Sequence, residues 1–277
     1  MIDLDLRSCE LCPRLCRVNR EEKPGACGCS ARLLAARAAL HFGEEPCISG
    51  TEGSGTVFFS GCNLHCVFCQ NHKISRERYG KELTAARLAD IFRELEEKGA
   101  NNINLVTPTP WVTEIIKALQ LYRPKVPVLY NTSGYERVEV LRELEGLIDV
   151  WLPDYKYADS ALAARFSGAA DYPAVARAAL QEMYRQSGNL TLNKEGKAVR
   201  GVMIRHLVLP LHLKNSFAVL DDIAALFGTE QYVSLMFQYT PFIRTRFPEL
   251  NRALTGRERA RAEAYFLECG FRNGYIQ

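Results

Sequence analysis

Short apolar, β-branched segments alternate with helical segments along most of the chain, and this alternation restricts the fold more than any other feature. Six strand-like runs lie between residues 55 and 240, at 55–60, 103–106, 127–131, 147–152, 202–209 and 232–237. Each run is followed by a stretch with helical spacing of apolar residues. The runs are almost continuously apolar, as expected for a parallel sheet that is covered on both faces.

This pattern predicts an α/β protein with a partial (β/α)6 TIM-like barrel. Eight β/α units close a full barrel, so six units leave one side open. A doubly wound open sheet is the alternative arrangement of the same units.

The first 50 residues differ from the rest, because they contain six of the ten cysteines and little strand pattern. We therefore expect a cysteine-rich, metal-binding N-terminal extension over residues 1–50 and a barrel over residues 51–277. A folded chain of this length buries enough surface to need no disulfide framework.

Composition narrows the functional class. The chain is 47% apolar and 24% charged with a net charge of +3, which excludes a disordered or fibrous protein. Glutamates interrupt the C-terminal arginines, so this region predicts a solvated helix rather than a nucleic-acid surface. We find no signal-peptide pattern and no run of about 18 uncharged apolar residues, so we expect a cytoplasmic protein without a membrane span. Ten cysteines in that setting indicate metal or redox chemistry.

Three cysteines follow the first predicted strand at the spacing Cys62-x3-Cys66-x2-Cys69. Soft thiolates select zinc, Cu(I) or iron–sulfur clusters. A [4Fe–4S] cluster needs one ligand per iron, so three thiolates leave the fourth iron open to a small molecule. The alternative is a zinc knuckle completed by His65 or His72.

Polar residues follow the other predicted strands, where the active sites of parallel α/β folds lie. Each of them alone is also a common turn or cap residue, but together they define one rim beside the three thiols. These rim residues are Thr107, Thr109, Asn131, Ser133, Asp154, Lys156, Arg205 and Gln238.

The cysteine triplet, with Phe68 before its third thiol, resembles the signature of the radical S-adenosylmethionine (SAM) superfamily. The stretches GSGTVFFSGCNLHCVFCQN, NINLVTPTP, YNTSGYE, LPDYKY and RHLVLP are similar to the branch of pyruvate formate-lyase activating enzyme-like proteins. The resemblance implies that SAM chelates the open iron of a [4Fe–4S] cluster. It further implies reductive cleavage of SAM to a 5′-deoxyadenosyl radical, which abstracts hydrogen from a substrate, as in the activation of glycyl-radical enzymes.

The resemblance also implies roles for individual residues around SAM. Cys62, Cys66 and Cys69 would bind the cluster. Phe68 would pack near the adenine, and Asn71 would bond toward the cluster loop.

Further roles belong to the rim. The family's Gly-Gly-Glu stretch is replaced here by residues 107–109, so backbone carbonyls or the hydroxyls of Thr107 and Thr109 would receive the SAM amino group. Asp154 and Lys156 match the Asp-x-Lys of the activating enzymes, in which the lysine meets the SAM carboxylate. Asn131 and Ser133 match the position that contacts the ribose or methionine part of SAM. Arg205 and Gln238 are further candidates for SAM binding on the same rim.

A second thiol set precedes the barrel, with the spacing Cys9-x2-Cys12-x3-Cys16-x10-Cys27. Four thiolates can close a structural zinc site or hold an auxiliary iron–sulfur cluster, and both alternatives stay open. The segment CELCPRLCRVNR is also similar to the leader of the same branch.

The resemblance implies a reductant such as flavodoxin or ferredoxin, and a substrate that is a glycyl-radical enzyme, another protein, a peptide or a metabolite. We expect neither a nucleic acid nor a membrane as a partner. The competing hypothesis is a non-catalytic iron–sulfur or zinc protein for electron transfer or assembly. It explains the thiols but not the polar residues at the strand ends.

Overall fold

A computed structural model describes residues 4–277. Its centre is a ten-stranded sheet with the order β10-β9-β8-β6-β5-β4-β2-β1-β3, and β7 pairs with β8 beside this path. Seven strands run parallel, and six of them correspond to the predicted ones: β2 (Ser54–Phe59), β4 (Ile103–Val106), β5 (Val128–Thr132), β6 (Val150–Pro153), β8 (Ala198–Leu207) and β9 (Tyr232–Met236).

The parallel strands follow one another in the sheet in the same order as in the sequence. A doubly wound sheet would reverse direction at a switch point, so this alternative is wrong. Within residues 4–277 no strand pairing joins β10 to β3 (Lys81–Leu83), which leaves the sheet unclosed. The predicted α/β fold with a partial barrel is confirmed.

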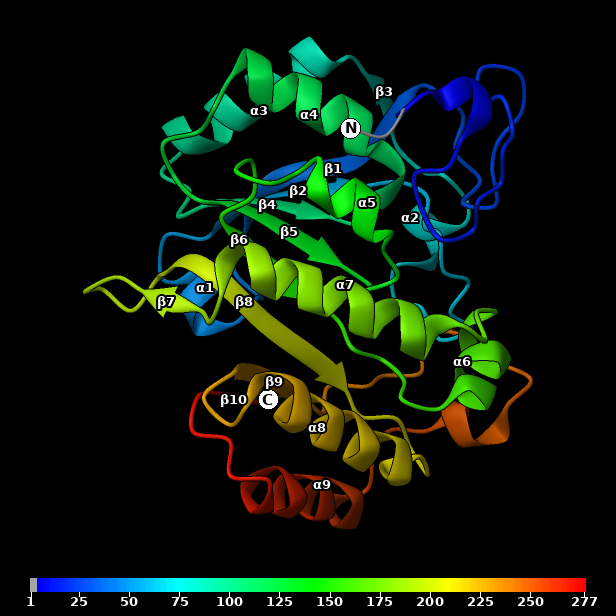
Figure 1. The fold of residues 1–277 in the computed structure, drawn as a ribbon, viewed down its shortest axis with the longest axis vertical. Helices are drawn as coiled ribbons and strands as arrows, with labels where there is room; N and C mark the ends of the chain where they lie inside the picture. The colour runs from blue at the N-terminus through cyan, green and yellow to red at the C-terminus, as the bar shows by residue number, and fades with distance from the viewer. Residues whose placement is uncertain (1–3) are drawn as a thin grey trace.

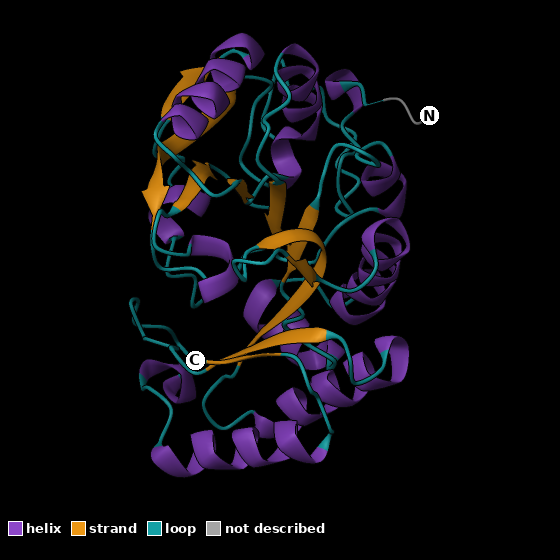
Figure 2. Cartoon of the chain, turned by 90° about the vertical axis from the view of Figure 1, so that its left-hand side faces the viewer, coloured by secondary structure: helices purple, strands orange, loops and turns teal. Residues whose placement is uncertain are grey.

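Helices follow the strands and surround the curved sheet (Figures 1 and 2). In Figure 1, α3 and α4 lie at the top, α7 crosses the middle, and α8 and α9 lie at the bottom. The longer helices are α3 (Ala85–Glu97), α4 (Val112–Leu121), α6 (Ser160–Ser167), α7 (Tyr172–Ser187), α8 (Leu213–Phe227) and α9 (Gly256–Glu268). The shorter helices are α1 (Pro46–Ser49), α2 (His72–Ser75) and α5 (Val138–Arg142).

Helix α3 shows why these segments are helical. Thr84 caps it by accepting a hydrogen bond from the Arg87 amide. Its buried residues include Leu88, Phe92 and Leu95, which recur at helical spacing and pack on the sheet.

Four strands were not among the six expected ones: β1 (Leu33–His41), β3, β7 (Thr191–Leu192) and β10 (Gly274–Ile276). Strand β1 runs antiparallel to β2, so the sheet already begins at Leu33, inside the segment expected to be an extension. Alanines and Arg37 interrupt its apolar pattern, which hides the strand in the sequence. The domain boundary at residue 50 stays a prediction.

Side chains two residues apart on a strand point to the same face of the sheet. On the inner face of the barrel they form two layers, one apolar and one polar. Leu129, Leu152 and Met203 form an apolar cluster with Ile48 and Cys47 of α1. Two residues further along each of these three strand segments, the same face carries the polar side chains of Asn131, Asp154 and Arg205. The apolar layer thus closes one end of the barrel and leaves a polar layer where the strands end. No helix in residues 4–277 combines the length and the apolar character needed to cross a bilayer.

Candidate functional site

A cavity of about 370 Å³ lies at the ends of the parallel strands. It brings together the thiol triplet and nine of the ten residues that we predicted around SAM. These nine are Phe68, Asn71, Thr107, Asn131, Ser133, Asp154, Lys156, Arg205 and Gln238. Their individual roles stay predictions.

The loop after β2 presents the three cysteines to this cavity. It turns at Gly61, whose φ is +84° and where a Cβ atom would lie 2.0 Å from Cys29 Sγ, so only glycine fits. Arg76 Nη2 holds the loop by donating to the carbonyl oxygens of His65 and Cys66, at 2.6 and 3.1 Å.

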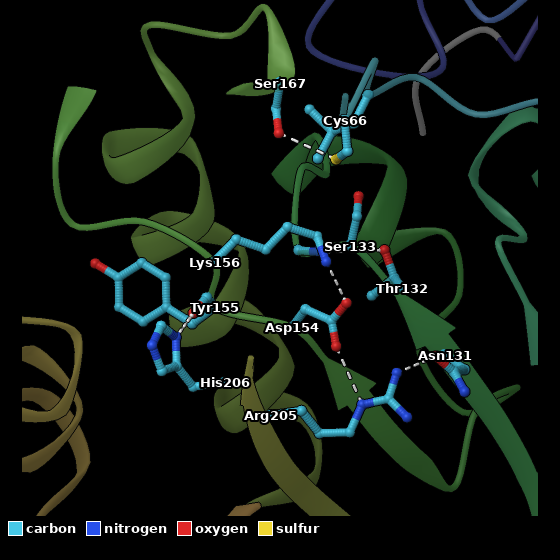
Figure 3. A network of polar contacts seen from close by, with 12 residues as sticks. Cys66, Asn131, Thr132, Ser133, Asp154, Tyr155, Lys156, Ser167, Arg205 and His206 are labelled. Carbon is cyan, nitrogen blue, oxygen red and sulfur yellow. Dashed lines mark hydrogen bonds and ion pairs between the residues drawn. The ribbon is translucent and has the colours of Figure 1, made fainter. Parts of the chain in front are cut away.

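Burial raises the pKa of the Cys62 and Cys66 thiols, and hydrogen bonds to the two sulfur atoms oppose this effect. Cys62 Sγ accepts from the Leu64 amide at 3.4 Å. Ser167 Oγ, at the end of α6, donates to Cys66 Sγ at 3.0 Å, as Figure 3 shows. Such bonds stabilise negative sulfur and tune iron–sulfur clusters. The donor set therefore fits three corners of a cluster.

Among the described residues that line this cavity there is no fourth cysteine. The nearby Cys29 thiol is directed to the Ser60 carbonyl oxygen at 3.5 Å. His65 Nε2 bonds to the Ala26 carbonyl oxygen at 2.9 Å, and His72 lies 3.9 Å from Glu77. His65 thus has a partner away from the thiols, whereas His72 Nδ1 is buried without one, so the zinc-knuckle alternative for this loop stays open.

A chain of buried charges crosses the cavity wall (Figure 3). Asp154 accepts from Lys156 Nζ at 2.5 Å and from Arg205 Nε at 3.1 Å. Arg205 also donates to Glu44 at 3.1 Å and to Asn131 Oδ1 at 2.5 Å. Lys156 thereby lies in the cavity wall with its ammonium group directed at Asp154, and Cys66 lines the same cavity.

The pKa directions agree with these ion pairs. Burial alone would raise the pKa of Asp154, but the charges of Lys156 and Arg205 outweigh it and lower the pKa. Burial alone would lower the pKa of Lys156, but Asp154 and Cys66 outweigh it and raise the pKa. Both groups are therefore charged at neutral pH. Burial raises the pKa of Glu44, only partly opposed by Arg205.

Thr107 follows β4 with φ at +58°, a left-handed conformation that is unfavourable for a β-branched residue. Its amide donates to the Asn131 carbonyl oxygen at 2.9 Å, which fixes the turn beside the cavity. Strain of this kind is concentrated at functional sites.

Thr109 is placed differently from the expectation. It lies in the 3₁₀ helix η2 (Thr109–Trp111), and its hydroxyl donates to Glu136 Oε1 at 2.5 Å. It lines a second cavity, next to the N-terminal cysteines, rather than the one with the triplet. The chain turns into η2 directly after Pro108, and this turn carries Thr109 away from the rim.

The second cavity, of about 10 Å³, is lined by Cys9, Cys12, Cys16 and Cys27. Arg20 is 1% exposed, and its Nη1 lies 4.0 Å from Cys9 Sγ and 2.7 Å from the Pro110 carbonyl oxygen. Within residues 4–277 no carboxylate forms an ion pair with this buried guanidinium, which also donates to the Ser30 carbonyl oxygen and lies over the Trp111 ring. In the part of the chain that is described, no three Cys, His, Asp or Glu side chains already surround one metal-ion position.

Sequence reasoning missed several residues of the site. Glu44 and Glu45 line the triplet's cavity from the segment after β1, the strand hidden in the sequence. Tyr239 lines it as well and meets Phe68 edge-on, with ring centroids 6.0 Å apart. Ser167 reaches Cys66 from 101 residues away in sequence, and no local pattern reveals such a contact.

Comparison with known proteins adds independent findings. The family model for the radical SAM superfamily matches residues 56–179, which include the triplet. The chain is 31% identical over 262 residues to the uncharacterized protein MJ0674 of Methanocaldococcus jannaschii, covering 91% of this chain and 72% of that protein.

Solved structures share the fold. A radical SAM methyltransferase from Sphaerobacter thermophilus superposes with a TM-score of 0.52 at 14% identity, over 81% of this chain and 66% of that one. Streptococcus suis SuiB, bound to the precursor peptide SuiA, gives 0.51 at 15% identity, over 78% of this chain and 46% of that one. This chain thus spans less than half the length of SuiB. With its triplet, its partial barrel and these relatives, the chain belongs to the radical SAM superfamily.

Proposed function

We propose that this protein is an enzyme that holds a [4Fe–4S] cluster on Cys62, Cys66 and Cys69 and uses it to cleave SAM reductively. One observation supports this proposal most strongly. The three thiols share a cavity with a lysine–aspartate pair, and among residues 4–277 no fourth cysteine lines that cavity.

When bound, the cluster and SAM supply the electron and the 5′-deoxyadenosyl radical for hydrogen abstraction. Lys156 would bind the SAM carboxylate as a point charge, and Asp154 would keep the ammonium group directed to it. Phe68 and Tyr239 would pack against the adenine. The cavity walls would keep water away from the reacting groups.

The experiment is anaerobic reconstitution with iron and sulfide, followed by incubation with SAM with and without dithionite. We expect 5′-deoxyadenosine only with reductant, and none from Cys66→Ser. A reconstituted protein that binds SAM but produces no 5′-deoxyadenosine would contradict the proposal. A protein that does not bind SAM would favour the competing non-catalytic role in electron transfer or assembly.

For the substrate, we propose a protein or peptide segment that enters through the open side of the barrel, as in the activation of glycyl-radical enzymes. SuiB, which has this fold, was solved with a precursor peptide, and this supports a peptide-like substrate. A stable glycyl-radical EPR signal in a co-purified partner would identify the activating reaction. Flavodoxin or ferredoxin is the proposed reductant.

We also propose a metal at the N-terminal thiols, either zinc or an auxiliary iron–sulfur cluster. The four cysteines around one cavity and the buried Arg20 beside Cys9 support it. Metal and sulfide analysis should compare Cys9/Cys12/Cys16/Cys27→Ser with Cys62/Cys66/Cys69→Ser. We expect the second variant to keep the N-terminal metal. A second variant free of both zinc and iron would contradict the proposal.

A further inference from the structure

Glu45 has a buried carboxylate that the fold does not explain. The residue lies between β1 and α1, is 2% exposed and lines the cavity that contains the cysteine triplet. Its Oε2 is buried without a hydrogen-bond partner. Within residues 4–277 neither carboxylate oxygen forms an ion pair. Buried carboxylates are normally paired, because removing the charge from water is costly.

Local structure does not account for this carboxylate. Glu45 precedes α1, but its side chain makes no capping bond to that helix. The amides of Ile48 and Ser49 instead donate to its backbone carbonyl oxygen. The carboxylate is therefore available to a group that the described part of the chain does not supply.

Charge balance in the cavity wall points to the same conclusion. Three carboxylates line the cavity, those of Glu44, Glu45 and Asp154, against the two cations Arg205 and Lys156. Arg205 is shared by Asp154 and Glu44, and Lys156 is paired with Asp154. Arg205 lies near enough for the charge of Glu45 to help raise its pKa. Both cations nevertheless make their ion pairs with the other two carboxylates, and within residues 4–277 none is made with Glu45.

The position of Glu45 indicates which kind of ligand would supply the positive charge for its carboxylate. His41, the last residue of β1, and Gly43 line the cavity together with Gln277, the residue after β10. The strands β1 and β10 lie toward opposite ends of the open sheet. Glu45 follows Gly43 by two residues and therefore belongs to the part of the cavity wall that borders the open side of the barrel.

We propose that Glu45 forms a substrate subsite for a positively charged group, an alkylammonium or a guanidinium. A cation that enters through the open side completes the ion pair that the protein leaves unmade, with charge-assisted hydrogen bonds to the carboxylate. This inference rests on the proposed function, since it assigns a substrate class to the same cavity.

The test is isothermal titration of the reconstituted, SAM-loaded protein with matched probes. N-acetyl-arginine methylamide is compared with its citrulline analogue, and N-acetyl-lysine methylamide with its norleucine analogue. We expect one cationic probe to bind at least about tenfold tighter than its neutral analogue. Glu45→Gln should reduce this preference below about twofold. Glu52→Gln is the control, because Glu52 is exposed and paired with Lys197 at 3.1 Å.

A stability measurement checks the same claim without a probe. Relief of an unpaired buried charge should raise the thermal midpoint of the unliganded protein by about 2–4 °C in Glu45→Gln and in Glu45→Met. Glu52→Gln should not raise it. A lowered midpoint in both Glu45 variants would overturn the inference.

Equal binding of charged and neutral probes, no binding of any probe, or a preference that survives in Glu45→Gln would also overturn it. Formation of 5′-deoxyadenosine is measured in the same samples and tests the proposed function separately. If SAM is still cleaved but the cationic probe is not preferred, only the substrate subsite is overturned. If the cationic probe is preferred but SAM is not cleaved, only the radical chemistry is overturned.

Discussion

The ammonium group of Lys156 lies 2.5 Å from Asp154 Oδ2, and Arg205 Nε lies 3.1 Å from the other oxygen of the same carboxylate. Asp154 therefore holds two cations at fixed positions in one cavity wall. Arg205 also makes ion pairs and hydrogen bonds with Glu44 and Asn131, whereas the ion pair of Lys156 is with Asp154 alone. We therefore propose that Lys156 meets SAM and that Arg205 supports the network.

Replacing Lys156 by methionine should weaken SAM binding at least about tenfold in the cluster-loaded protein. The change removes the positive charge for the SAM carboxylate, and such a charged hydrogen bond contributes about 1.5–3 kcal/mol. Equilibrium dialysis with labelled SAM measures it. Lys117→Met is the control, because Lys117 pairs with Glu114 on the exposed face of α4. Unchanged SAM affinity in Lys156→Met would contradict the assigned role.

Replacing Thr107 by glycine should stabilise the protein by about 1 kcal/mol. The left-handed conformation costs a β-branched residue about 1–3 kcal/mol, and the greater freedom of glycine in the unfolded chain offsets part of the gain. Urea unfolding measures the free energy. If backbone carbonyls receive the SAM amino group, SAM affinity should stay within about twofold, since glycine keeps the backbone of the turn. Loss of SAM binding would instead assign the contact to the hydroxyl.

Replacing Ser167 by alanine should make the reduction potential of the cluster more negative. The hydrogen bond to Cys66 Sγ stabilises the added electron, and a tenfold effect corresponds to about 59 mV for one electron. An EPR-monitored redox titration measures the shift. Tyr157→Phe is the matched comparison, since the Tyr157 hydroxyl bonds to Ser167 Oγ at 2.8 Å and should cause a smaller shift in the same direction. An unchanged potential in Ser167→Ala would contradict this role.

His206 should make stability depend on pH. Burial lowers its pKa to about 4, and its ring nitrogens bond to the Tyr155 carbonyl oxygen at 2.7 Å and to Ser216 Oγ at 2.9 Å. In the unfolded chain the pKa is about 6.5, so below that pH the unfolded state takes up a proton that the folded state excludes. The contribution of His206 to the free energy of unfolding is therefore complete above pH 6.5, and it is lost as the pH falls toward 4.

Between pH 7.5 and pH 5, this group should cost the wild type about 2 kcal/mol of unfolding free energy. Urea unfolding at both pH values should show a smaller decrease in His206→Gln, which does not titrate. Equal decreases in the two proteins would show that His206 does not contribute.

The sequence allowed the barrel to be predicted because its parallel strands are apolar on both faces. It also placed the triplet and most rim residues, since strand ends meet at one edge of such a sheet. Strand β1 escaped prediction because its alanines give no β signal, and Glu44 and Glu45 were missed with it. Thr109 was misplaced because the turn into η2 depends on packing around Pro108 and Trp111.

Contacts between segments that are far apart in the sequence could not be predicted either. Ser167 reaches Cys66 only because α6 packs beside the triplet loop, where Val67 donates to the Phe166 carbonyl oxygen at 2.8 Å. The partner of a buried charge is a property of the packed molecule rather than of a short sequence pattern. The unpaired carboxylate of Glu45 therefore becomes visible only in the folded chain.

The most direct test of the central claim is electron–nuclear double resonance on the reduced, reconstituted protein with SAM labelled with ¹⁵N in its amino group and ¹⁷O in its carboxylate. Direct coupling of both labels to the cluster is the expected result, because one iron is left for SAM by Cys62, Cys66 and Cys69. A cluster that shows neither coupling at saturating SAM, and whose fourth iron is bound by a protein side chain, would contradict the account.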